Sequence, residues 1–357
     1  MGKTKAVALM LLSIALVLAA AACGGSGKGD SPSPSASPSA SAESSPSPSA
    51  GSAGTVTVKF SEVIRSIFYA PHYIAISKGF FEEQGLKIDM NTAQGSDKGA
   101  AALIAGTADI SLVGPETAIY IHNQKGAKTL KIFAQLTVTD GSFLLSRNKL
   151  DAFKWSDLEG KTVIGWRPGS SPQMVMNSML QKEKVQGVNV VTNIASTAMT
   201  GAFASGQGDF IQLFEPVAST LVKEGKAYYA ASLGESFGPF PETSYVATSD
   251  YIAKHPDVVA KFAKAVHEGA AWLETASEAD IVAALKPFFD GTPEDMIAQS
   301  VANYKKQGTW SADQVLTPEQ FETLQNVLIE NGTLKAEEKI AKLEDVADLT
   351  FVLPKGN

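Results

Sequence analysis

The sequence predicts an α/β fold of two doubly wound α/β lobes with a central ligand cleft, and a helical C-terminal segment packed on the first lobe. Two observations carry this prediction. Residues from about 56 to 219 contain a weak internal repeat at an offset of about 100 positions, and each copy is strand, helix, strand, helix, strand. From about residue 245 onward the apolar pattern is mostly helical.

The strands of the repeat are short apolar runs next to glycines or acidic residues, which is typical of buried parallel strands. We predict them at 56–60, 85–88 and 110–113 in the first copy, and at 161–166, 187–190 and 210–213 in the second. Arg65 and Arg167 follow the first strand of each copy, and Glu116 and Glu215 follow the third. These joint matches favour duplication over chance.

Helices connect these strands and dominate the C-terminal part. Within the repeat we predict them at 71–84, 95–106, 172–184 and 196–206, and beyond it at 256–274, 280–289 and 318–331. The last three should pack on the first lobe, so that lobe 1 comprises 55–140 and 245–357 and lobe 2 comprises 141–244. Asp140–Gly141 and Pro241–Thr243 are candidate hinges.

The first 54 residues have a different composition. Lys3 and Lys5 precede an apolar run that ends at Cys23, the layout of a signal peptide over 1–22. The cysteine after three alanines resembles the bacterial lipobox, which implies a lipidated Cys23 and a lipid-anchored protein on the extracytoplasmic face of the cell membrane. The Ser/Pro-rich stretch 23–54 cannot bury enough surface to fold and is predicted to be a disordered tether. The alternative is an ordinary secreted protein.

Composition excludes several function classes. The formal net charge is −7 and no Lys/Arg-rich run stands out, so we expect no nucleic-acid partner. Cys23 is the only cysteine, so the globular part can hold neither a disulfide nor a cysteine-bound metal. Phosphate-binding loops, zinc-type histidine motifs and nucleophile elbows are missing. We therefore expect no cofactor, no metal and no enzymatic activity.

Several segments together resemble one family. They are Tyr69–Ala75, Lys78–Leu86, Ala105–Ile110, Asp157–Val163 and Phe214–Pro216. In this order they resemble the solute-binding lipoproteins of bacterial ABC importers, in the sulfonate, nitrate, taurine and thiamine-pyrimidine group, whose fold is the type II periplasmic binding protein fold. The resemblance implies capture of a small solute by lobe closure and its delivery to a membrane permease with an ATPase.

Loops at helix starts are candidate sites for an anionic group. Backbone N–H groups and the positive end of the helix dipole meet there. The candidates are Gly95, Ser96, Ser170, Ser171, Ser196 and Thr197. Simple helix capping by these serines and threonine is the alternative.

Charged side chains extend the candidate site. Arg65 and Arg167 could hold an oxyanion through two parallel hydrogen bonds, or could instead pair with a carboxylate of their own lobe such as Glu62 or Glu116. Glu116 and Glu215 lie at equivalent strand ends, where they could accept from an ammonium or ring amine. Two acids in the cleft favour a zwitterionic or amine-bearing organic solute, and Glu215→Ala should weaken its binding.

Aromatic residues complete the candidate set. Phe68, Tyr69, Trp166 and Phe214 could stack on a flat ligand or enclose an alkyl chain, although such residues at strand ends are more often core. His72 could donate to the ligand, or could cap a helix or lie at its surface.

These observations predict a monomeric solute-binding lipoprotein that takes a small aliphatic sulfonate, a taurine-like compound or a nitrogenous ring. Its partners would be the solute, the permease and the ATPase, and the membrane through the lipid. A surface sensor that reports ligand to a membrane partner is the alternative, as is a binder of a thiamine-pyrimidine precursor.

Overall fold

The computed structural model of this protein describes residues 54–352. The predicted signal peptide, Cys23 and the tether up to residue 53 lie outside the described residues. Within the described part, none of the helices has the combined length and apolar character needed to cross a bilayer.

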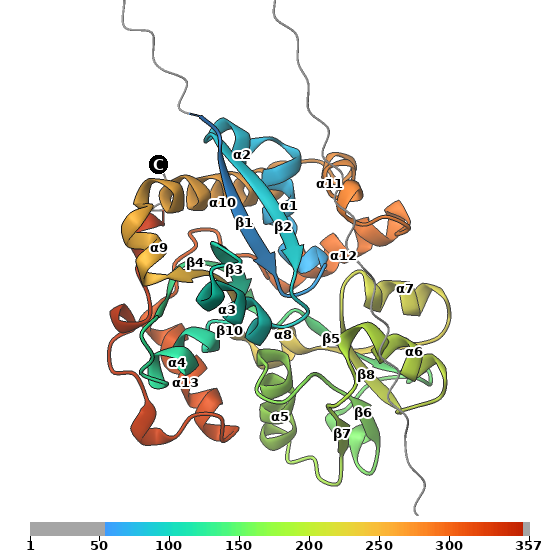
Figure 1. The fold of residues 1–357 in the computed structure, drawn as a ribbon. Helices are drawn as coiled ribbons and strands as arrows, with labels where there is room; N and C mark the ends of the chain where they lie inside the picture. Colours follow the sequence, from blue (N-terminus) through green and yellow to red (C-terminus); the bar gives the residue numbers. More distant parts are fainter. Residues whose placement is uncertain (1–53, 353–357) are drawn as a thin grey trace, which may run out of the picture. The chain divides into compact units, whose positions relative to one another are not determined.

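The first sheet contains the strands of the first repeat copy. Its strand order is β2-β1-β3-β10-β4. The strands are β1 (Val56–Glu62), β2 (Leu86–Thr92), β3 (Ile110–Val113), β4 (Leu130–Thr139) and β10 (Pro239–Thr248). β1 pairs in parallel with β2 and β3, and Figure 1 shows β1 beside β2. β10 runs antiparallel to both β3 and β4.

The second sheet repeats this plan. Its order is β7-β6-β8-β5-β9. The strands are β5 (Ser142–Ser146), β6 (Thr162–Ile164), β7 (Asn189–Val191), β8 (Phe210–Phe214) and β9 (Tyr228–Ser232). β6 is parallel to β7 and β8, whereas β5 is antiparallel to β8 and β9. The two copies of the repeat therefore fill matching positions in two sheets, which confirms the predicted fold class.

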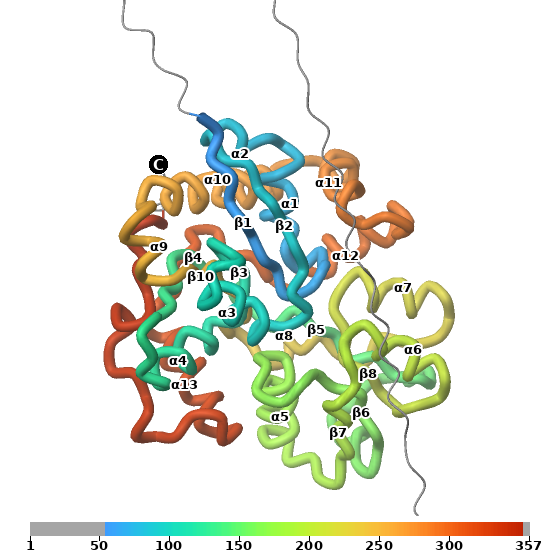
Figure 2. The backbone as a smooth tube through the Cα atoms, in the orientation of Figure 1, coloured from blue at the N-terminus to red at the C-terminus, as the bar shows by residue number. Residues whose placement is uncertain are grey.

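The chain passes between the sheets twice. β4 leads through Asp140 and Gly141 into β5, and β9 leads through α8 (Leu233–Phe237) into β10. In each sheet the antiparallel strand, β10 or β5, is thus the first strand after the chain crosses from the other sheet. The tube in Figure 2 traces both crossings. The predicted lobe boundary at 140/141 falls between β4 and β5, and the one at 244/245 falls inside β10.

The helices of the repeat differ from the prediction in two places. The helix expected at 71–84 is two helices, α1 (Ala70–Ser77) and α2 (Phe80–Glu83), separated at Gly79, whose φ of 79° interrupts the helix. The helix expected at 196–206 is a 3₁₀ turn, η3 (Ser196–Ala198), followed by α6 (Met199–Ala204). Their counterparts are regular: α5 (Ser171–Lys182) and α3 (Ser96–Ala105). The third strands lead into α4 (Glu116–Asn123) and α7 (Val217–Lys223).

The C-terminal helices pack on the first lobe, and two of them also contact helices of the second. They are α9 (Ser249–Lys254), α10 (Pro256–Thr275), α11 (Glu278–Leu285), α12 (Glu294–Gln307) and α13 (Pro318–Glu330). The apolar stripe of α10 is buried against α1 and α2. However, α12, which the sequence pattern did not predict, contacts α7, and α13 contacts α5. The predicted packing of the C-terminal segment on the first lobe is therefore confirmed, since α10 contacts α1 and α2 and α13 contacts β10. Two of its helices have contacts to the second lobe as well.

Candidate functional site

A cavity of about 340 Å³ lies where the two sheets meet. Its walls come from the carboxyl ends of parallel strands: Val63 and Ile64 follow β1, Gly114 follows β3, Trp166 follows β6, and Phe214 ends β8. In open α/β sheets this is where ligands bind, because loops and helix N-termini converge there.

The cavity brings together most of the predicted site residues. Those that line it are Tyr69, Gly95, Ser96, Trp166, Arg167, Ser170, Ser171, Ser196, Thr197 and Phe214. Five predicted residues are not part of its lining: Arg65, Phe68, His72, Glu116 and Glu215.

Two long helices begin at the cavity. Gly95 and Ser96 start α3, and Ser96 Oγ accepts a hydrogen bond from the Gly114 N–H at 3.1 Å. Ser170 and Ser171 start α5. The first N–H groups of a helix have no partner within it, and the helix dipole makes this end positive. The cavity wall therefore offers two positively polarised helix starts, one from each sheet.

The serine side chains at the α5 start are occupied by protein contacts. Ser170 Oγ donates to the Arg167 carbonyl at 2.7 Å, and Ser171 Oγ donates to Glu116 Oε2 at 2.9 Å. Ser196, in the 3₁₀ turn η3, donates to Gln94 Oε1 at 3.3 Å. The contacts of Ser171 and Ser196 join elements of the two sheets, so these side chains hold the cavity walls together.

The two predicted arginines have different environments. Arg167 lines the cavity and pairs with Asp97 in the first turn of α3, with Nη2 3.0 Å from Asp97 Oδ1. Arg65 instead donates from Nε to Glu62 Oε1 at 2.8 Å and lies over the Tyr73 ring. Arg65 is thus engaged by a carboxylate of its own lobe, and only Arg167 stands at the cavity.

The two predicted acids are buried beside the cavity. Glu215 accepts from the Ser219 N–H at 2.8 Å, from Tyr229 Oη at 2.5 Å and from Asn303 Nδ2 at 2.7 Å. Its carboxylate is therefore satisfied by the protein. Glu116 lies behind Gly114, where an added Cβ would be 2.1 Å from Glu116 Oε2. Burial raises the pKa of Glu116 to about 7, although the Ser171 hydrogen bond acts in the opposite direction.

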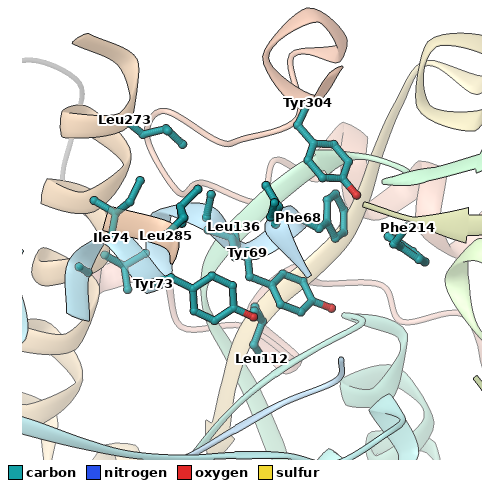
Figure 3. Close-up of a cluster of buried hydrophobic side chains, with 14 of the residues drawn as sticks. Phe68, Tyr69, Tyr73, Ile74, Leu112, Leu136, Phe214, Leu273, Leu285 and Tyr304 are labelled. Atoms are coloured by element: carbon teal, nitrogen blue, oxygen red, sulfur yellow. The ribbon is translucent and has the colours of Figure 1, made fainter. Parts of the chain in front are cut away.

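The aromatic residues form one connected group. Trp166 meets Phe214 edge to face, with ring centroids 5.1 Å apart. The ring centroid of Phe68 lies 5.3 Å from that of Phe214 and 5.3 Å from that of Tyr304 in α12. Figure 3 shows these three side chains together. Trp166, Phe214 and Tyr69 thus provide the apolar wall, and Phe68 supports it from the core.

His72 is a core residue. It is fully buried, its ring stacks on Phe60 at 4.1 Å, and its Nδ1 is 3.2 Å from Tyr245 Oη. Burial lowers the pKa of His72 to about 3, because a charged imidazole would lose its hydration there. The ring is therefore neutral at physiological pH, packs against Phe60 of β1 and does not line the cavity.

Glu242, which was not among the predicted site residues, lines the cavity from β10. Its side chain is buried, and its Oε2 has no hydrogen-bond partner within the described residues. Burial, followed by the nearby charges of Asp140 and Glu116, raises the pKa of Glu242 well above its usual value. One signal was available in the sequence: a single acid interrupts an otherwise apolar and hydroxylic strand just after Pro241.

Between residues 54 and 352, the structure contains no group of three or more His, Cys, Asp or Glu side chains arranged to hold a metal ion. The cavity lining offers helix N-termini, aromatic faces and the charged residues Asp97, Lys98, Arg167 and Glu242.

Comparisons with known proteins agree with this architecture. The family model described as NMT1/THI5-like matches residues 67–278. YtlA of Bacillus subtilis (strain 168), named only as a binding protein, is 43% identical over 280 residues, which cover 78% of this chain and 84% of YtlA. A binding protein of Brucella abortus (strain 2308) is 26% identical over 204 residues, 55% of this chain and 60% of that protein.

Solved structures share the fold at low identity. The alkanesulfonate-binding protein SsuA from Xanthomonas axonopodis pv. citri, bound to MOPS, superposes with a TM-score of 0.68 at 16% identity, over 84% of this chain and all (100%) of SsuA. The periplasmic nitrate-binding protein NrtA from Synechocystis PCC 6803 gives a TM-score of 0.67 at 17% identity, over 83% of this chain and 86% of NrtA.

Proposed function

The chain belongs to the NMT1/THI5-like family, and from that membership we propose that it is the solute-binding protein of an ABC importer. The relatives named above are binding proteins, and so is this chain, in agreement with the expectation that it is not an enzyme. Its solute would be a small organic molecule, held in the cavity and delivered to a membrane permease and its ATPase.

The observation that carries this proposal is the origin of the cavity walls. Gly95 and Gly114 come from elements of the first sheet, whereas Trp166, Ser171 and Phe214 come from elements of the second. A ligand held there would touch both sheets at once. Within residues 54–352 the chain crosses between the two sheets twice. We therefore propose that one lobe, 55–140 with 245–357, and a second lobe, 141–244, close around the solute.

The walls support a small solute with an anionic or ring-shaped part. The starts of α3 and α5 favour a sulfonate or carboxylate, and Arg167 adds a guanidinium. Tyr69, Trp166 and Phe214 suit an alkyl chain or a flat ring. We therefore propose an aliphatic sulfonate, a taurine-like compound or a nitrogenous ring, the classes that the sequence resemblance implies.

We further propose that the protein acts at the outer face of the cell membrane as a monomer. The support is the leader, Cys23 and the Ser/Pro-rich stretch that follows it. A lipid on Cys23 would hold the globular part near the permease.

The test is a ligand panel on protein that has been unfolded and refolded to remove carried-over solute. Melting temperature is measured against taurine, alkanesulfonates, nitrate, aminopyrimidines and thiamine. A ligand that binds only the folded state adds about 2.7 kcal/mol at a hundredfold excess over its dissociation constant. Uptake of the best ligand is then measured in cells with and without the gene. Binding together with lost uptake supports the importer, whereas binding with unchanged uptake favours a sensor.

A further inference from the structure

Glu242 is a buried acid at the cavity, and the part of the chain that the structure describes leaves its Oε2 unpaired. It is 3% exposed, and it lines the cavity next to Thr243. Within the described residues its Oε2 accepts no hydrogen bond. Buried polar groups in native proteins nearly always have partners, because an unpaired one costs free energy, and an unpaired carboxylate costs the most.

The local backbone explains how this side chain reaches the cavity. The pairing of β10 with β4 shifts register between Pro239 and Thr243 and again between Thr243 and Ser244. Such irregularities bend a strand and re-aim a side chain, and they are frequent next to binding sites. Glu242 lies inside the shifted stretch, on the segment by which the chain returns from the second sheet to the first.

Between residues 54 and 352, no basic side chain forms an ion pair with Glu242. Lys98 and Arg167 line the same cavity, but Arg167 pairs with Asp97. The charges that act on Glu242 most strongly are acids, Asp140 and Glu116. Because burial and these two acids raise its pKa and disfavour its ionised form, Glu242 needs a positively charged partner to be held as a carboxylate.

The partner that Glu242 lacks would come from the solute. Resting on the proposed solute-binding function, we propose that Glu242 is the specificity-determining residue of the cavity and that the solute carries a cationic donor, an ammonium or amidinium group, which pairs with it. The sequence analysis assigned this role to Glu116 and Glu215, but neither lines the cavity, and Glu215 already has its donors.

The rest of the cavity fits such a solute. The faces of Trp166 and Phe214 are favourable surroundings for a cation and for the apolar body that bears it. An anionic group at the other end of the same molecule would find the starts of α3 and α5. A charged pair formed at this buried side chain contributes both affinity and selectivity, since a solute without the cation leaves Glu242 unpaired.

The experiment compares wild type with Glu242→Gln, which keeps the shape and removes the charge. Glu62→Gln is the matched control, because Glu62 is also a buried acid but lies outside the cavity lining and is paired with Arg65. Each full chain is refolded free of ligand, incubated with a small-molecule extract of bacterial cells and dialysed. Retained compounds are released and identified by mass spectrometry.

The expected result is that wild type and Glu62→Gln retain an amine or amidine compound and that Glu242→Gln loses it. Retention of a compound without a cationic group, equally by wild type and Glu242→Gln, would overturn the inference and leave the proposed function intact. If refolded wild type retains nothing, the proposed function itself fails, and the inference fails with it.

Defined probes give the size of the effect. Dissociation constants are measured for taurine against ethanesulfonate and for benzamidine against benzamide. Breaking a buried charge pair should weaken binding of taurine and benzamidine, which bear the cationic group, by about 30-fold or more in Glu242→Gln. Binding of ethanesulfonate and benzamide, which lack it, should stay within about threefold. Equal losses for both members of a pair would overturn the inference. Glu242→Asp keeps the charge and should keep the preference for the cationic member, which covers the case in which Glu242→Gln folds poorly.

Discussion

Arg167, on the loop after β6, forms an ion pair with Asp97 in the first turn of α3, with 3.0 Å between Nη2 and Oδ1. The pair joins an element of the second sheet to one of the first at the cavity wall. It also decides what Arg167 can do, because a guanidinium bound to Asp97 is only partly available to an anionic solute.

We therefore expect Asp97→Asn to strengthen binding of an anionic probe. The side chains of Arg167 and Asp97 are 35% and 64% exposed, so the pair itself contributes only about 0–1 kcal/mol to folding. Releasing Arg167 should tighten the binding of ethanesulfonate by about two- to fivefold, measured by titration calorimetry. Asp295→Asn, which breaks the exposed pair with Lys223 outside the cavity, is the control. An unchanged affinity in Asp97→Asn would remove Arg167 from the anion site.

Glu215→Ala should destabilise the fold. The buried carboxylate accepts hydrogen bonds from Ser219, Tyr229 and Asn303, and deleting it leaves these donors without their acceptor. The expected loss in the free energy of unfolding is about 2–4 kcal/mol, measured by urea denaturation. The sequence alone predicted weaker binding in a stable protein. That outcome, with an unchanged midpoint, would show that Glu215 serves the ligand and not the fold.

Glu116 should make stability depend on pH. Its pKa is about 7 in the folded protein and near the usual 4.5 when unfolded, so the folded state binds its proton more tightly. This contribution is fully present below pH 4.5 and is lost as the pH rises to about 7, with a total of about 3 kcal/mol. Glu116→Gln should remove this dependence.

His72 has the opposite effect on stability. Its pKa is 6.5 in the unfolded chain and about 3 in the folded protein, so below pH 6.5 the unfolded chain binds a proton that the folded protein does not, and stability falls as the pH falls. The informative quantity is therefore the difference between wild type and Glu116→Gln. We expect the variant to gain stability relative to wild type between pH 5 and pH 7.5. A difference that does not change with pH would contradict the buried, protonated state of Glu116.

Gly141→Ala should test the first crossing between the sheets. A Cβ at Gly141 would lie 2.3 Å from Cε2 of Phe68, a fully buried ring held between Phe214 and Tyr304. Overpacking of this kind costs about 1–3 kcal/mol, which thermal denaturation would detect. Gly201→Ala is the matched control, because the space around Gly201 is open and it lies within α6, where alanine is the better helix former. Equal stabilities of the two variants would contradict the tight packing at the crossing.

The candidate site shows which inferences a sequence supports. Gly95, Ser96, Ser170 and Ser171 were found from the rule that helix starts gather at the carboxyl ends of parallel strands, and all four line the cavity. Whether they contact a solute is still a prediction. Glu242 was not found, because it lies on an antiparallel strand that this rule does not cover.

The sequence by itself determined the three parallel strands of each sheet, because short apolar strands, glycine stops and repeated strand–helix units are local patterns whose meaning does not depend on distant residues. It did not predict β4, β5, β9 and β10, which complete the two sheets. The tertiary structure alone decided which of two side chains at equivalent positions of the repeat lines the cavity. Arg65 and Arg167 match in sequence, but Glu62 engages the first and leaves only the second at the cavity. The ion-pair partners of a side chain, its burial and the bulges of its strand depend on segments that are far apart in the chain. These three features decide which charged side chains remain available to a ligand.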